Sequence, residues 1–295
     1  MTAPDPAALE SLRQLLPENT SSRGLDLLPA TDDLGNAAAA LWESKRVLIL
    51  TGFLIASLEI GETDGPPGSI GLAAACDALG KAVCLVTDRH SQPAMEQVIR
   101  KWHWRQTPRL ICLERGNEEL VSYSLLSQFA PDHIVAIERP GQNSDGHYHS
   151  MAGRDFTNLV PDSDLLLHLA RQQGVPITAI GDGGNEVGMG KIAPFVREHV
   201  PHGELICAAF PADNLIVAGI SNWGASALAA LLSLYAGKQL MHPPEKEGEL
   251  VRTLVDAGLV DGATRAATLS VDGYELADYL AHYQKIYELS AKYLP

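Results

Sequence analysis

The chain has 295 residues, of which 46% are hydrophobic and 20% charged. These values are typical of a globular protein with one large or two ordinary domains, and they exclude a disordered or fibrous protein. The 22 basic and 36 acidic residues give a net charge of −14, which repels a phosphate backbone, so we expect no nucleic-acid partner. The apolar runs stop well before the roughly 20 residues of a bilayer span, so we expect no membrane partner.

The cysteines and the N-terminal segment bear on the compartment. The four cysteines lack CxxC spacing and have apolar neighbours, a pattern of small buried side chains in a reducing compartment rather than of disulfides or zinc. The first thirty residues lack the basic and apolar regions of a secretory signal. We therefore expect a cytoplasmic protein.

Seven short apolar runs, rich in β-branched residues, predict buried parallel strands. They are 46–52, 81–88, 109–114, 133–140, 176–183, 204–210 and 214–221. Helical spacing fills most of the intervals between them, at 68–79, 93–101, 118–129 and 161–173. This alternation predicts an α/β fold with an open, mainly parallel sheet that carries helices on both faces.

The C-terminal third predicts helices only, at 222–235, at 248–257 and at the end of the chain. The last helix places four side chains on one face: Leu276, Leu280, Tyr283 and Tyr287. Such a face either packs on the domain or joins the subunits of a homo-oligomer. We predict one α/β domain over 1–295, with an N-terminal helical arm (1–33) and a helical C-terminal part (222–295).

Polar clusters follow four of the predicted strands, and in an open parallel sheet ligands bind beyond the carboxyl ends of the strands. These clusters are GETDGPPGS (61–69), the loop 138–155, GDGGNEVGMGK (181–191) and SNWG (221–224). We expect four of their residues to gather at one edge of the sheet: Glu62, Glu138, Asp182 and Ser221.

The cluster GDGGNEVGMGK has five glycines, which permit close approach of the backbone to a ligand. A dinucleotide fingerprint needs glycine where Glu186 stands, and a Walker loop needs Ser or Thr where Ile192 follows Lys191. We therefore expect neither NAD nor ATP. Asp182, Asn185 and Glu186 remain as site candidates; the alternative for Glu186 is a helix cap worth about 0.3–1 kcal/mol.

The loop after residue 137 is dense in donors, acceptors and titratable groups. His147 and His149 share a face if the segment is extended, which suits a metal or an acid/base pair. The alternative is two solvated loop histidines, since no third His or Cys completes a ligand set. A hard divalent ion on Asp and Glu oxygens fits this sequence better.

Other acids allow both a site role and a capping role. Glu62 and Asp64 precede Pro66 and Pro67 at a rigid turn, where they either serve a site or cap the following helix. Three further aspartates are predicted as helix caps: Asp88, Asp162 and Asp164.

Five segments together resemble the D-glutamate cyclase family. In order over roughly residues 45–275, they are GETDGPPGS, IERPGQNSDGHY, GDGGNEVGMGK, IVAGISNWGA and LVDGATRAATLSVDG. The resemblance implies interconversion of D-glutamate and 5-oxo-D-proline, with water as co-product and a requirement for manganese or a similar divalent ion. Animal members carry an additional N-terminal hydro-lyase-like domain, for which 295 residues leave no room.

This reaction assigns expected roles to the polar residues. An acid among Glu62, Asp64 and Glu138 would take the amine proton. A divalent ion on Asp182, Glu186 and Asp64, or Arg139 with backbone N–H groups, would neutralise the γ-carboxylate. Substrate binding is assigned to seven residues: Arg139, Asn143, His147, Arg154, Asn185, Ser221 and Asn222, with Arg154 on the α-carboxylate. Two alternatives stay open, a nucleotide- or sugar-phosphate-dependent enzyme and a non-catalytic amino-acid-binding module.

Overall fold

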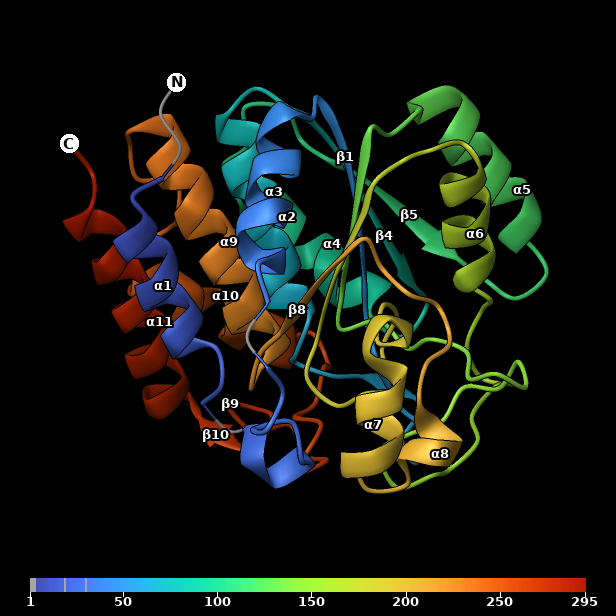
Figure 1. Ribbon diagram of the computed structural model, residues 1–295. Helices are drawn as coiled ribbons and strands as arrows, with labels where there is room; N and C mark the ends of the chain where they lie inside the picture. The colour runs from blue at the N-terminus through green and yellow to red at the C-terminus, as the bar shows by residue number, and fades with distance from the viewer. Residues whose placement is uncertain (1–3, 19, 30) are drawn as a thin grey trace.

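Six parallel strands form the central sheet of the computed structural model, which describes residues 4–18, 20–29 and 31–295 (Figure 1). They are β1 (Arg46–Thr51), β4 (Ala82–Asp88), β5 (Arg109–Leu113), β6 (His133–Ile137), β7 (Ile177–Gly181) and β8 (Asn214–Val217). Their spatial order is β5-β4-β1-β6-β7-β8, so the direction of winding reverses between β1 and β6. The predicted open parallel sheet is confirmed, and this reversal marks where ligands bind in doubly wound sheets.

Helices cover both faces of the sheet (Figure 1). One face carries α1 (Pro6–Leu15), α2 (Asp33–Glu43), α3 (Pro66–Ala78), α4 (Gln92–Lys101), α9 (Ser221–Ala236), α10 (Pro244–Asp256) and α11 (Leu276–Lys292). The other carries α5 (Glu118–Ser124), which continues as a π-helical turn (Leu125–Phe129), and α6 (Asp164–Gln172). The segments predicted as helices at 68–79, 93–101, 118–129, 161–173, 222–235 and 248–257 are confirmed.

Short elements complete the fold around the carboxyl edge of the sheet. They are the 3₁₀ turns Thr20–Arg23 and Gly190–Ile192, the helices α7 (Ala193–His199) and α8 (Gly203–Ile206), and the hairpins β2 (Leu54–Ile55) with β3 (Ile60–Gly61) and β9 (Ser270–Val271) with β10 (Tyr274–Glu275). The β9–β10 hairpin lies at the lower end of the molecule in Figure 1.

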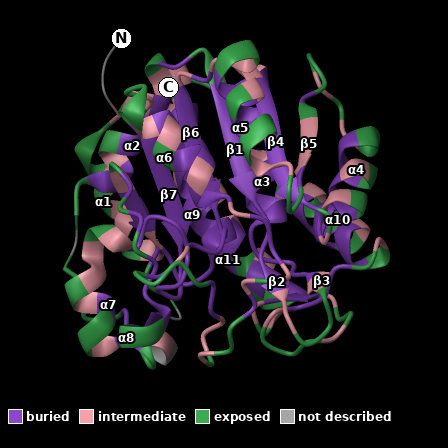
Figure 2. Ribbon diagram, turned by 90° about the vertical axis from the view of Figure 1, so that its right-hand side faces the viewer, coloured by how far each residue is buried: buried purple, intermediate pink, exposed green. Residues whose placement is uncertain are grey.

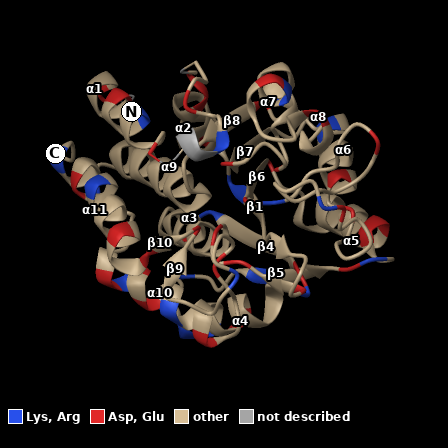
Figure 3. Ribbon diagram, turned by 90° about the horizontal axis from the view of Figure 1, so that it is seen from below, with Lys and Arg blue, Asp and Glu red and all other residues tan. Residues whose placement is uncertain are grey.

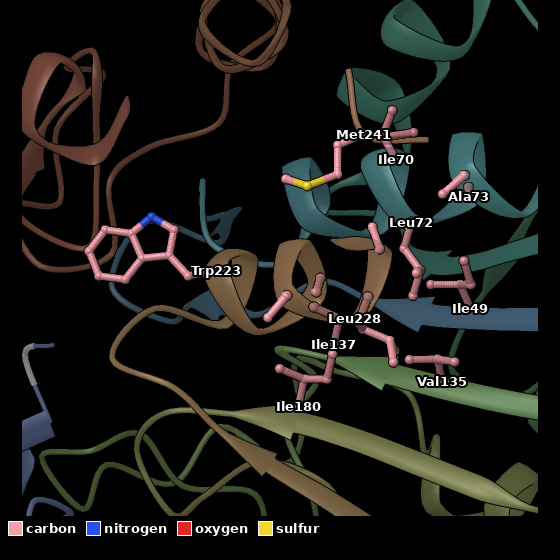
Figure 4. Packing of buried hydrophobic residues seen from close by; sticks show 14 of the residues in the cluster. Ile49, Ile70, Leu72, Ala73, Val135, Ile137, Ile180, Trp223, Leu228 and Met241 are labelled. Carbon is pink, nitrogen blue, oxygen red and sulfur yellow. The ribbon is translucent and has the colours of Figure 1, made fainter. Parts of the chain in front are cut away.

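Strand side chains alternate between two apolar layers. Val47 and Ile49 of β1 enter the layer shared with α3 and α9, whereas Leu48 and Leu50 enter the layer shared with α6. Both sets are buried, which is why the strand reads as a continuous apolar run (Figure 2). Figure 4 shows Ile49 among side chains of α3 and α9.

The segment 204–210, predicted as a strand, is not one. Its first residues form α8, and the following backbone bonds to loops, with Ala208 N donating to Gly184 O (3.1 Å) and Ala209 N to Gln142 O (2.7 Å). Ile206 instead fills a small apolar cluster with Val196 of α7. A short apolar run has no periodicity that separates a strand from a buried loop.

The apolar face of the C-terminal helix α11 packs against other helices of the same chain. Tyr279, Tyr283 and Ile286 are buried in the layer that includes α9 and α10, which confirms the packing role.

Acidic and basic residues alternate on outer helices such as α10 and α11 (Figure 3). In the described part of the chain, no helix combines the length and apolarity that a membrane span requires. All four cysteines are free.

Helices α3 and α9 meet at their N-termini and cap each other. Asp64, just before α3, accepts hydrogen bonds from the backbone N–H groups of Ser221 and Asn222 (both 2.9 Å). In return, the Asn222 Oδ1 accepts from the N–H groups of Gly65 (2.9 Å) and Gly68 (2.8 Å). Each side chain satisfies donors that a helix N-terminus leaves free.

This contact leaves no room for a side chain at Gly68. A Cβ there would lie 2.9 Å from both the Ala225 Cβ and the Asn222 Cα, so Gly68→Ala is expected to lower the free energy of unfolding by about 1–3 kcal/mol through overpacking. Urea denaturation measures the change. Gly248→Ala on α10 is the control, because its Cβ would meet only the flexible end of Leu280, at 3.1 Å. Equal stability of the two variants would contradict the close-packing argument.

Candidate active site

A cavity of about 470 Å³ opens at the carboxyl edge of the sheet. It is walled by the loops after β1, β6 and β7, by the N-terminal arm and by the segment 262–272. The described residues that line it are Arg23, Phe53, Leu54, Ile55, Ala56, Ser57, Glu62, Asp64, Glu138, Ser150, Met151, Ala152, Arg154, Asp182, Asn185, Glu186, Gly262, Ala263, Arg265 and Asp272. The loops therefore converge as the topology predicts.

Three buried carboxylates form the centre of this cavity. Oxygens of Asp64, Glu138 and Asp182 all lie within 4.8 Å of one another. The Ser221 Oγ donates a hydrogen bond of 2.7 Å to the Glu138 Oε2. With Glu62 also on the cavity wall, the predicted gathering of Glu62, Glu138, Asp182 and Ser221 is confirmed.

Glu138 leaves β6 in an unusual backbone conformation. Its φ is 44°, in the left-handed region that costs energy for a residue with a side chain. The neighbouring Gly65, with φ of 97°, is forced to be glycine because its Cβ would lie 2.8 Å from both the Glu138 Cβ and the Thr51 Oγ1. The strain at Glu138 is thus held where its carboxylate faces the other acids.

Glu186 holds the glycine-rich loop. Its two carboxylate oxygens accept hydrogen bonds from the N–H groups of Gly183 (2.8 Å) and Gly184 (2.7 Å). These donors precede α7, so the helix-cap alternative is wrong. Of the predicted metal ligands Asp182, Glu186 and Asp64, two belong to the trio of acids whose oxygens lie within 4.8 Å of one another, and Glu138 takes the place of Glu186 there.

Asn222 and Arg139, predicted to bind substrate, are engaged in structural contacts. The Asn222 amide is used in the helix caps and in a bond to Thr63 O (3.2 Å). The guanidinium of Arg139 is 0% exposed and forms an ion pair with Asp88 at 2.6 Å. Asp88, predicted as a helix cap, therefore also takes part in a buried ion pair. Neither residue lines the cavity among the described residues.

The loop 138–155 contributes fewer residues to the cavity than predicted. Asn143 shapes the loop, with its Oδ1 accepting from His147 N at 3.0 Å. His147 is half exposed and pairs with Asp155 at 2.9 Å, and the His149 ring lies 6.1 Å from it between centroids. Neither histidine is among the described residues that line the cavity. Arg154 and Asn185 do line the cavity, as predicted.

Of the predicted capping residues Asp162 and Asp164, the first caps a helix and the second anchors a loop. Asp162 Oδ1 accepts from Leu165 N (3.1 Å) at the start of α6, as a cap does. Asp164 instead accepts from Gln142 N at 3.2 Å and so anchors the loop after β6.

Three charged cavity residues escaped the sequence analysis: Arg23, Arg265 and Asp272. The Arg23 guanidinium forms ion pairs with Asp182 and Asp272, joining the N-terminal arm to the end of β7 and to the β9–β10 turn. Arg23 lies in a stretch with neither helical nor strand periodicity, so no pattern marked it. Arg265 and Asp272 lie in LVDGATRAATLSVDG, a segment that carried the resemblance without an assigned role.

The crowding of acids changes their protonation. Burial, and after it repulsion from neighbouring acids, raises the pKa well above its ordinary value at three carboxyls: Glu62, Asp64 and Glu138. Burial followed by repulsion from Asp182 raises the pKa of Glu186 to about 7 and that of Asp272 to about 7, although Arg23 opposes both shifts. The site therefore holds protons near neutrality and attracts cations.

The raised pKa values predict a loss of stability as the pH increases. Between about pH 5 and pH 7 the folded protein binds more protons at Glu186 and Asp272 than the unfolded chain does, so the free energy of unfolding falls across this window. Urea denaturation in the presence of a chelator measures the slope. Asp272→Asn is expected to flatten it and Asp256→Asn, on the surface of α10, to leave it unchanged; a stability that increases from pH 5 to pH 7 would refute the account.

Comparison with known proteins agrees with this geometry. The family model described as D-glutamate cyclase-like, C-terminal, matches residues 12–290, a range that contains every described cavity residue. Human D-glutamate cyclase, mitochondrial, is 35% identical in an alignment over 241 residues that covers 77% of this chain and 39% of the human protein. The chain thus spans about two fifths of the length of that relative. It belongs to the D-glutamate cyclase-like, C-terminal family.

Proposed function

We propose that this protein interconverts D-glutamate and 5-oxo-D-proline, with water as the co-product. The observation that carries the proposal is the convergence of Asp64, Glu138 and Asp182 in a cavity at the switch point of the sheet, in a chain of this family. The related human protein is named a D-glutamate cyclase. A cavity of about 470 Å³ is of a size that suits a small amino acid.

The residues present suit a divalent cation. Asp64, Glu138 and Asp182 offer oxygens at mutual distances of at most 4.8 Å, and hard cations prefer carboxylate oxygens. The buried Oδ1 of Asn185 has no hydrogen-bond partner among the described residues, so it offers a further neutral oxygen at the same wall. We propose that these residues hold Mn²⁺ or Mg²⁺, which when bound supplies a Lewis acid for the γ-carboxylate.

Lactam formation also needs a base, and Glu62 fits that role. The α-amine of D-glutamate is protonated at neutral pH and must lose a proton before its nitrogen attacks the γ-carbon. Glu62 is buried, its pKa is raised well above the ordinary value by burial and then by Asp64, and its carboxylate makes no hydrogen bond within the described chain. A raised pKa makes a carboxylate a stronger proton acceptor.

The remaining groups orient the reaction. The C–N bond forms as one γ-oxygen leaves as water, which carries away the two protons released by the ammonium group. Ser221 fixes one oxygen of Glu138 at 2.7 Å, and Arg23 fixes Asp182 through their ion pair. Both acids are thereby held in place before substrate arrives, which avoids reorganisation during the reaction.

Glu62→Gln tests the base. The change is expected to lower kcat by about 10²–10⁴ without lowering the melting temperature at pH 7, because it replaces a crowded carboxyl by a neutral amide. Purified protein is incubated with D-glutamate and, separately, with 5-oxo-D-proline, and both compounds are followed by chiral chromatography. Glu59→Gln, exposed on the β2–β3 turn, is the matched control. Full activity of Glu62→Gln would exclude Glu62 as the base.

Metal removal tests the cation. Turnover is expected to fall on chelation and to return better with saturating Mn²⁺ or Mg²⁺ than with Zn²⁺, because the trio offers only hard oxygen ligands. Elemental analysis verifies removal of the metal. Unchanged turnover by verified metal-free protein would refute the cation, and saturable binding without turnover in all conditions would favour an amino-acid-binding module.

A further inference from the structure

The acidic cavity poses a problem for a dicarboxylate substrate. Among the described residues, the lining includes six acids: Glu62, Asp64, Glu138, Asp182, Glu186 and Asp272. The largely buried cation, Arg23, is engaged by two of these acids. A divalent cation can receive the γ-carboxylate, but the α-carboxylate needs a second positive group away from the acids.

Two exposed arginines line the cavity from different loops. Arg154 lies in the loop after β6, and Arg265 lies between α10 and β9. Neither guanidinium has a hydrogen bond or ion pair to another described residue. Both are therefore free to bind an anion at the mouth.

The backbone that carries Arg265 is held rigidly. The Asp261 carboxylate accepts from Thr264 N (2.7 Å) and Gly273 N (2.8 Å), and Arg265 N donates to Asp261 O (2.8 Å). Arg265 itself has a φ of 58°, a left-handed conformation that the surrounding bonds must maintain. Hydrogen bonds thus fix the backbone at Arg265, whereas its exposed guanidinium has no bond to another described residue.

The same loop is joined to the segment that carries the proposed base. Thr63 N donates to Val260 O (2.9 Å) and the Thr63 Oγ1 donates to Ser270 O (2.9 Å). A Cβ at Gly262 would lie 1.9 Å from the Glu62 Oε2, so the loop packs directly on the Glu62 carboxylate. These contacts set the position of the Arg265 backbone relative to Glu62.

We propose that Arg265 determines specificity by binding the α-carboxylate, which is retained in both D-glutamate and 5-oxo-D-proline, with Arg154 lining the same cavity from another loop. A guanidinium pairs with a carboxylate through two parallel hydrogen bonds. With this carboxylate at the mouth, the amine and the γ-carboxylate face the acids and the cation. The inference rests on the proposed function, because it uses the substrate named there.

The proposal has a kinetic consequence that a structural role lacks. Because the α-carboxylate does not change during the reaction, its binding stabilises substrate and transition state alike. Loss of Arg265 should therefore increase KM for both substrates while kcat stays nearly constant.

Calorimetric titration with 5-oxo-D-proline and with its uncharged carboxamide tests the contact. In Arg265→Gln, affinity for the acid is expected to fall by about 10- to 100-fold, the loss typical of one charged hydrogen-bonded pair, whereas affinity for the carboxamide stays constant. Arg265→Lys should restore part of the loss. Arg252→Gln, at an exposed arginine of α10 outside the described cavity lining, should match the unmodified protein.

The other outcomes either overturn the assignment or separate it from the proposed reaction. Equal losses for acid and carboxamide would mean that Arg265 only supports the loop, and a loss in Arg154→Gln but not in Arg265→Gln would assign the carboxylate to Arg154. Absence of binding by the unmodified protein would refute the inference together with the substrate. If the selective loss occurs but no turnover is found, the proposed reaction fails and the carboxylate contact stands.

Discussion

The reciprocal capping of α3 and α9 is the contact on which the rest of the site depends. Asp64 satisfies the N–H groups of Ser221 and Asn222, and Asn222 satisfies those of Gly65 and Gly68. The exchange brings two helix N-termini to one point, where their dipoles favour negative charge. It also presents the Ser221 hydroxyl to Glu138, so one set of bonds joins the loops after β1, β6 and β8.

The capping also explains how so many carboxylates share a small space. Buried acids repel one another and are costly without partners. Here Asp64 is bound to helix N–H groups, Glu186 to the N–H groups of the glycine loop, and Asp182 and Asp272 to Arg23. Glu62 and part of Glu138 remain without such compensation, and burial raises their pKa values well above the ordinary value, as it does for Asp64 despite its bonds to the helix N–H groups.

Arg23 and Arg139 show why residue type alone assigns roles poorly. Both are arginines close to aspartates, but Arg139 binds Asp88 outside the described cavity lining whereas Arg23 reaches the acids from the N-terminal arm. The sequence distance of Arg23 from Asp182 is 159 residues and from Asp272 is 249 residues. A contact over such a separation leaves no local periodicity, because only the packing of the arm on the sheet creates it.

The sequence by itself determined the parallel sheet, most of its helices and the edge at which the site lies, because apolar period and glycine position are local properties that backbone geometry imposes. It also identified Asp64, Glu138 and Asp182 as members of one site. Only the tertiary structure decided that 204–210 joins loops rather than the sheet, that Glu186 holds its own loop and that Asn222 caps α3. These outcomes depend on which donors lie within about 3 Å of an acceptor after the chain has packed, and hydrogen bonds lose their strength beyond that range.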